Sequence, residues 1–230
     1  MGGQACVFYG AAQFSRDLDL LVLADAESLN ALRQAMDLLE AEPIAVPPFE
    51  LQFLSRGHAV HFRCEREDVQ GLRIDVMSRL RGVGDFEELW TRRTTIQVED
   101  AEVDMLSVPD LVRAKKTHRD KDWPMIGNLV EQVYFSLPSE PSPEQIEFLL
   151  EELRTPKLLR SMVEQFPDAA GRIAPRRLAV ACARVGNLEE VRAAIGSEEA
   201  LERERDRAYW DPLKDELEQI RRTRMKRGGD

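Results

Sequence analysis

The chain has 230 residues, a formal net charge of -10, and a composition that is 43% hydrophobic and 32% charged. This length suffices for one large domain or two small ones, and the composition is that of an ordinary globular protein. The negative charge argues against attraction of nucleic acid to the whole surface, although it leaves room for a local basic patch.

Cysteine usage and hydropathy indicate an intracellular protein. The three cysteines are an odd number without metal-binding or redox spacing, which is typical of reduced thiols. The sequence shows neither a charged and then apolar leader nor an apolar stretch as long as a bilayer span. We therefore expect a cytoplasmic protein with no membrane insertion.

The amino-terminal half alternates between strand and helix patterns. The apolar run LDLLVLA at 18–24 is typical of a buried strand, and residues 25–42 carry apolar side chains at helical spacing. A proline-rich stretch at 43–48 ends this helix. We then expect strands at 50–55, 58–65 and 72–80, a short helix at 84–90, and an extended, turn-containing stretch at 94–107.

From residue 108 onward the pattern is helical. Pro109 suits a first helical turn, and the segment PSEPSP at 138–143, with three prolines in six residues, is the clearest linker in the chain. The expected helices cover 108–118, 123–137, 143–153, 156–166, 174–185 and 187–195, followed by a long charged helix that ends near residue 227.

These elements predict an α+β fold, in which a small mixed sheet with flanking helices precedes an all-helical carboxyl-terminal module. We assign residues 1–106 to the core that carries the sheet, 107–140 to helices with a basic motif, and 141–230 to the helical module. The boundary lies either near 105, where the strands stop, or near 140, at the linker.

Asp17 and Asp19 stand at the start of the first expected strand. Side chains alternate along a strand, so both carboxylates point to the same face, one pleat apart. Burying a carboxylate is costly without a nearby cation. The spacing suits Mg²⁺, which prefers oxygen ligands and completes its shell with water and phosphate. An Asp-x-Asp motif is also common in solvated turns and at helix starts.

Asp75 lies inside the apolar strand RIDVM, on the same face as Arg73 and opposite Ile74 and Val76. A third carboxylate on a neighbouring strand would let two metal ions sit roughly 3.5–4 Å apart, the arrangement that serves phosphoryl chemistry. A charge on an edge strand is the alternative interpretation. We predict that the catalytic, metal-binding residues are Asp17, Asp19 and Asp75.

Gly2 and Gly3 open a short expected helix at 4–9, and Ser15 follows two residues before the first aspartate of the pair. Glycines at the amino-terminus of a helix let backbone N–H groups approach a phosphate closely. The hydroxyl of Ser15 is placed to contact the same phosphate.

The order of Gly-Gly, short helix and Ser-x-Asp-x-Asp resembles the minimal nucleotidyltransferase fold of polymerase-β-like enzymes, whose third acid lies on a later strand, as Asp75 does. Within that superfamily the chain is similar to AbiEii-type toxins and related uncharacterised bacterial nucleotidyltransferases. The motifs GGQACVFYG, SRDLD and VPDLVRAKKTHRDKD carry this resemblance, which covers about residues 2–130.

The resemblance implies an enzyme that moves a nucleoside monophosphate from a nucleoside triphosphate to an acceptor hydroxyl on RNA such as tRNA, on protein or on a small molecule. It implies two Mg²⁺ ions, with Asp75 also able to accept the hydroxyl proton, and a toxin-like effector held in check by an antitoxin protein. The nucleotide-binding residues that it implies are Gly2, Gly3, Ser15, Lys115 and Arg119.

The basic segment supports two interpretations. On a helix, Lys115 and Arg119 share a face because they are four residues apart, and they could neutralise the triphosphate. The same residues also suit a solvated helix face. Asp122 is a candidate either for an ion pair with Lys121 or Arg119 or for a direct catalytic role.

Two departures from the family pattern leave other functions open. A helix and a strand usually precede the Gly-Gly pair, whereas here it follows Met1, so either the start lies further upstream or an edge element is missing. A second acid that often follows the Lys-Asp pair is replaced by Met125. The alternatives are a degenerate nucleotidyltransferase domain that binds nucleotide or a partner without turnover, and a helical interaction protein.

Overall fold

The computed structural model describes residues 1–227, with side chains described up to residue 223. The chain forms two compact units. The first comprises Met1–Phe8, Ala12–Ala114 and the chain from Arg207 onward, and the second comprises Tyr9–Ala11 and Lys115–Asp206. The chain passes from the first unit to the second between Ala114 and Lys115, and returns to the first between Asp206 and Arg207. The assignment of 1–106, 107–140 and 141–230 to separate parts stays a prediction.

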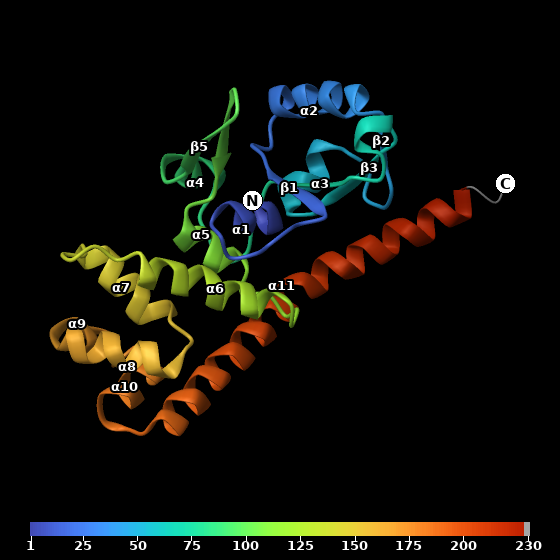
Figure 1. The fold of residues 1–230 in the computed structure, drawn as a ribbon. Coiled ribbons are helices and arrows are strands. Elements are labelled where there is room, and N and C mark those ends of the chain that lie inside the picture. The colour runs from blue at the N-terminus through green and yellow to red at the C-terminus, as the bar shows by residue number, and fades with distance from the viewer. Residues whose placement is uncertain (228–230) are drawn as a thin grey trace. The chain divides into compact units, whose positions relative to one another are not determined.

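A four-stranded mixed sheet forms the centre of the first unit. Its strand order is β1–β4–β3–β2, in which β1 and β4 are parallel and the other pairs are antiparallel. This sheet and the surrounding helices confirm the predicted α+β class (Figure 1). The strands are β1 (Asp17–Leu21), β2 (Ala41–Pro43), β3 (Val60–Cys64) and β4 (Arg73–Met77).

One face of this sheet packs against α2 (Ala26–Leu38) and α3 (Leu51–Arg56). Alternation along β1 directs Leu18 and Leu20 to this face, so the intervening aspartates point to the other face. The apolar face thereby buries the core and leaves the opposite face for polar side chains. The fully packed core consists of Leu29, Met36, Leu54, Val60, Phe62, Cys64, Ile74 and Val76.

The strand predicted at 50–55 is wrong, because these residues form α3. The helix buries the adjacent Phe53 and Leu54, and Gly57 closes it with a left-handed φ of 100°. A run of six residues is too short for periodicity to separate a strand from a buried helical turn. The glycine was the informative signal, since a helix often ends at a residue with positive φ.

The helix predicted at 25–42 forms but ends earlier than expected, at Leu38. Glu40 adopts a positive φ of 49°, and the chain then enters β2, an edge strand that the sequence analysis did not predict. The β2 residues pair with β3, so this strand depends on a partner about twenty residues away in the chain.

The remaining elements of the first unit follow the sequence predictions, except that the helix expected at 108–118 ends at Ala114 and a short helical turn forms at Glu67–Val69. The helix α1 (Gly2–Phe8) lies beside β1 (Figure 1). The predicted short helix and the extended, turn-containing stretch are both present. These elements are η1 (Glu67–Val69), α4 (Phe86–Thr91), the antiparallel pair β5 (Thr94–Val98) and β6 (Ala101–Met105), and α5 (Val108–Ala114).

The second unit is helical, as predicted, with two differences. The helix α9 was not expected, and the two helices expected after residue 186 form a single helix that continues through Pro212. Within residues 1–227, no helix combines the length and apolar character needed to cross a membrane. The helices are α6 (Asp122–Phe135), α7 (Pro143–Glu152), α8 (Pro156–Gln165), α9 (Pro167–Ile173), α10 (Leu178–Val185) and α11 (Leu188–Arg227), of which only the part of α11 up to Asp206 belongs to this unit.

Candidate functional site

The polar face of the sheet brings the three predicted aspartates together. The parallel register pairs Asp19 with Asp75, and Asp17 with Arg73. Paired residues on neighbouring strands point to the same face, and the strands lie about 4.8 Å apart. Asp17 follows on that face one pleat from Asp19. The expected gathering of carboxylates on one face therefore follows from the register.

The glycine pair packs directly against this face. The N–H of Gly3 donates a hydrogen bond to Oδ2 of Asp19 over 3.3 Å, and Ser15 donates to the carbonyl of Asp17 over 3.0 Å. A Cβ on Gly2, whose φ is 67°, would lie 1.8 Å from Oδ2 of Asp19. A Cβ on Gly3 would lie 2.4 Å from the hydroxyl of Ser15. Both positions therefore need glycine because of close approach to the predicted site.

Asp75 is buried, with 9% of its surface exposed, and two neighbours hold its carboxylate. Arg73 donates from Nε to Oδ1 over 2.7 Å and from Nη2 to Oδ2 over 3.1 Å. Nδ1 of His61 lies 2.8 Å from Oδ1. His61 is the cross-strand partner of Asp75 on β3, so it occupies the same face.

Nδ1 of His61 has two polar neighbours that make opposite demands on its proton. Nη2 of Arg73 lies 3.1 Å from Nδ1, and a guanidinium can only donate. The ionised carboxylate of Asp75 can only accept, so a hydrogen bond from His61 to Asp75 requires the tautomer with a proton on Nδ1.

The two donors decide the protonation state of Asp75. Burial by itself would raise the pKa of this carboxyl, but the hydrogen bonds from His61 and Arg73 outweigh burial and hold the pKa below the ordinary 3.8. The pKa of Arg73 is raised, first by its hydrogen bond to Asp75 and further by the charges of Asp17 and Asp19. Asp75 is therefore ionised at neutral pH, and Arg73 interacts with all three carboxylates.

His61 is the residue of this site that the sequence analysis missed. Alternation within RIDVM already placed Arg73 beside Asp75, since that pattern is local. The place of His61 depends on how residues 60–64 pair with 73–77 across the connection between them. Fixing that register from the sequence would have identified His61 as the neighbour of Asp75.

The donor set fits a hard divalent cation that is shared with phosphate. Within residues 1–223, no three His, Cys, Asp or Glu side chains are grouped so that they alone could hold a metal ion. Mg²⁺ usually needs only one or two carboxylates, with substrate phosphates and water as the other ligands. Asp19 and Asp75 provide two carboxylates in register. Each ionised carboxylate offers about four acceptor positions, so the three bonds to Asp75 leave capacity for a cation.

Lys115 and Arg119, the predicted nucleotide contacts, belong to the second unit. The helix expected at 108–118 ends at Ala114, and residues 115–121 form a loop, so the two side chains do not share a helix face. The prediction of a helical basic motif is wrong at this point. The side chains of this loop turn instead toward the first residue of α6, three to seven residues further along the chain.

That first residue is Asp122, which is 2% exposed. It accepts hydrogen bonds from the Thr117 hydroxyl over 2.5 Å and from Nε of Arg119 over 2.8 Å, and Nζ of Lys115 lies 3.5 Å away. The structural ion pair with Arg119 that the sequence suggested is present. Lys115 is buried against the same carboxylate, with 7% of its surface exposed. A nucleotide contact by Lys115 or Arg119 stays a prediction.

Neither a model of a known protein family, nor a curated protein, nor a solved structure matches this chain. The arrangement of Asp17, Asp19 and Asp75 on one sheet face and the sequence motifs are therefore the basis of the functional proposal.

Proposed function

We propose that the chain is a Mg²⁺-dependent nucleotidyltransferase with a polymerase-β-like catalytic unit. The observation that carries this proposal is the parallel register that sets Asp19 beside Asp75, with Asp17 one pleat away and the Gly2–Gly3 backbone against Asp19. The reaction would transfer a nucleoside monophosphate from a nucleoside triphosphate to an acceptor hydroxyl.

The charge balance of the polar face supports a cation. Asp17, Asp19 and Asp75 share this face with the guanidinium of Arg73 and the imidazole of His61. Glu42 also lies on this face, but it stands opposite the guanidinium of Arg63, so this second pair adds no net charge. Carboxylates brought together out of water repel each other unless positive charge offsets them. A divalent cation would supply the missing charge, and its binding would also attract the phosphates of a nucleotide.

In this proposal some residues bind the cation and others orient the residues that bind it. When bound, Mg²⁺ would neutralise phosphate charge during transfer. Asp19 and Asp75 would hold it, and Asp17 would hold a second ion or the same one. Arg73 and His61 fix the orientation of Asp75. Its lowered pKa makes Asp75 a weak base, so a ligand role suits it better than accepting the hydroxyl proton.

The bond changes define the products. The acceptor oxygen forms a bond to the α-phosphorus, the bond between that phosphorus and the oxygen bridging to the β-phosphorus breaks, and pyrophosphate leaves. The acceptor hydroxyl gives its proton to solvent or to a nearby base. Catalysis of this kind depends mainly on positioning and on neutralising charge.

The acceptor and the regulation are proposed from the sequence resemblance alone. It suggests RNA such as tRNA, a protein or a small molecule as acceptor, and it suggests an antitoxin as partner. Lys115 and Arg119 remain candidates for phosphate contacts within this proposal.

A label-transfer assay tests the proposal. The full chain is incubated with Mg²⁺ and each α-labelled nucleoside triphosphate, with total RNA and cell lysate as acceptors. We expect label on an RNA, protein or small-molecule fraction, and a loss of at least about a hundredfold in Asp19→Asn. Glu42→Gln is the matched control, because Glu42 lies on the same sheet face, in the row of Arg63, Arg73 and Asp17. Equal activity in both variants would contradict the proposal.

A degenerate domain that binds nucleotide without turnover is the second candidate. It is favoured by the engagement of both Asp75 oxygens with Arg73 and His61. Saturable nucleotide binding that depends on Asp19, with no label on any acceptor fraction, would select this candidate.

A further inference from the structure

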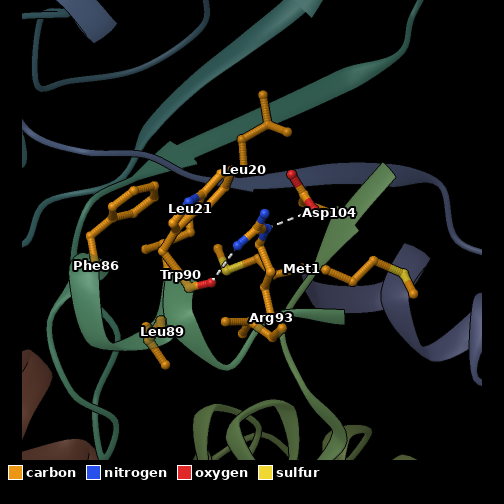
Figure 2. Close-up of a pocket in the computed structure, with 10 residues that line it drawn as sticks. Met1, Leu20, Leu21, Phe86, Leu89, Trp90, Arg93 and Asp104 are labelled. Carbon is orange, nitrogen blue, oxygen red and sulfur yellow. Dashed lines mark hydrogen bonds and ion pairs between the residues drawn. The ribbon is translucent and has the colours of Figure 1, made fainter. Parts of the chain in front are cut away.

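A cavity of about 100 Å³ opens next to the end of β1 in the first unit (Figure 2). Leu20 and Leu21 both line it although they point to opposite faces, which places the cavity at the edge of the sheet, where β1 is the terminal strand. Its apolar wall is formed by Met1, Leu20, Leu21, Phe86, Leu89 and Trp90.

One residue that lines this cavity, Leu21, lies on the carboxylate face of β1. Leu21 follows Asp19 by two residues on the same face of β1, a separation of about 7 Å along a strand. Met1, which lines the cavity, donates from its ammonium to the carbonyl of Asp19 over 2.9 Å. The separation of about 7 Å between Asp19 and Leu21 is comparable to the distance between the base and the α-phosphate of an extended nucleotide.

The wall formed by α4 and the following residues is aromatic and cationic. The rings of Phe86 and Trp90 stack with centroids 5.6 Å apart and an interplanar angle of 19°. The guanidinium of Arg93 lies 4.1 Å from the ring centroid of Trp90, which is 45% exposed. Aromatic rings and guanidinium planes are the surfaces on which nucleobases stack.

The carboxylate of Asp104, which lines the cavity, can accept further hydrogen bonds. Oδ1 of Asp104 accepts from Nε of Arg93 over 2.9 Å and from the Thr95 hydroxyl over 2.5 Å. Oδ2 of Asp104 accepts no hydrogen bond from any side chain or backbone group of residues 1–223. The hydrogen bond from Thr95, reinforced by Arg93, lowers the pKa of Asp104, so it is an ionised acceptor at neutral pH.

We propose that this cavity receives the base of the nucleotide, and that Asp104 favours bases with an exocyclic amino group, namely adenine, cytosine and guanine, over uracil. The inference rests on the proposed function. A cavity of about 150 Å³ accepts a benzene ring. The present cavity therefore takes the edge of a planar ring, and the ribose and phosphates extend along β1 toward Asp19.

Calorimetric binding to the full chain in Mg²⁺ tests the inference, with ATP, CTP, GTP, UTP and inorganic tripolyphosphate as ligands. We expect UTP to bind about tenfold more weakly than the other three, because it has no amino group for Asp104. Trp90→Ala should weaken the binding of every nucleotide about tenfold and leave tripolyphosphate unchanged.

Two variants separate the acceptor role of Asp104 from a structural role. Asp104→Asn removes the ionised acceptor, and we expect the preference against UTP to disappear. Thr95→Val removes one hydrogen bond to Oδ1 but leaves Oδ2 in place, so the preference should persist. Loss of the preference in Thr95→Val as well would show that Asp104 only supports the hairpin, which would overturn the inference.

The measurements with tripolyphosphate distinguish failure of the proposed base site from failure of the proposed function. Binding of tripolyphosphate and all nucleotides with equal affinity, unaffected by Trp90→Ala, would overturn the base site and leave the proposed function standing. Failure of tripolyphosphate and of all four nucleotides to bind would overturn the proposed function, and the base site with it.

Discussion

Asp75 in the first unit and Asp122 in the second are both buried carboxylates held by cationic or hydrogen-bonding neighbours, yet their surroundings differ. Asp122 faces both the ammonium of Lys115 and the guanidinium of Arg119, so its cluster carries no excess of negative charge. Asp75, by contrast, lies on a face that also carries Asp17 and Asp19. Under the proposed function, the Asp122 cluster serves structure and the excess of negative charge around Asp75 serves cation binding.

The largest expected effect tests the structural half of this comparison. Asp122→Asn leaves the buried ammonium of Lys115 without a carboxylate, so we expect a loss of about 3 kcal/mol in the free energy of unfolding of the second unit. Urea denaturation monitored by circular dichroism measures it. Asp120→Asn is the matched control, because the Asp120 side chain is 92% exposed and its removal should have little effect. Equal destabilisation by both variants would contradict the assignment.

The close approach of Gly2 to Asp19 gives the second prediction. Gly2→Ala places a methyl group where Oδ2 of Asp19 now lies, and we expect transfer activity to fall about a hundredfold. Gly71 has a φ of 82° with no atom within 4 Å of its would-be Cβ. Gly71→Ala therefore carries the same backbone strain without the collision, and it should keep its activity. Label transfer by the two variants at matched protein concentration checks this, and equal loss in both would contradict it.

The excess charge on the sheet face gives a third, smaller effect. Asp19→Asn removes one of three repelling carboxylates and keeps an acceptor for the N–H of Gly3. Without metal, we expect Asp19→Asn to be more stable than the wild type by about 1 kcal/mol. Its thermal midpoint in EDTA should therefore be higher. Added Mg²⁺ should raise the midpoint of the wild type only. A variant that is less stable in EDTA would show that the carboxylates do not repel each other.

The smallest effect concerns pH. Because the pKa of Asp75 is lower in the folded state, its contribution to stability is fully present above the ordinary value of 3.8 and is lost as the pH falls through the lowered pKa. Wild type should therefore lose stability relative to Asp75→Asn as the pH falls from 4 to 2. Parallel denaturant titrations at stepped pH measure this difference. A difference that stays constant over this range would contradict the ionised, hydrogen-bonded state of Asp75.

The parts of this comparison that sequence could predict are the local ones. Alternation within DLDLL places Asp17 and Asp19 on one face of their strand, and alternation within RIDVM places Arg73 and Asp75 on one face of theirs, because a strand has a fixed period. The class of the fold followed from the order of elements. These predictions needed no knowledge of which strands pair.

The parts that sequence could not predict depend on contacts that a periodic pattern does not show. His61 joins the site only through the long-range register of β3 with β4. The loop at 115–121 departs from the expected helix, and its side chains bind Asp122, a few residues further along the chain. The six residues of α3 matched a strand pattern equally well, and only their burial and the left-handed Gly57 decide for a helix.

The most direct test of the central claim is a titration with Mn²⁺, followed by electron paramagnetic resonance of the free ion, with and without a non-hydrolysable nucleoside triphosphate analogue. We expect wild type and Glu42→Gln to bind Mn²⁺ saturably, more tightly when the analogue is present, and Asp19→Asn to lose this binding. Wild type that binds Mn²⁺ no better than Asp19→Asn would contradict a cation site on the polar face of the sheet.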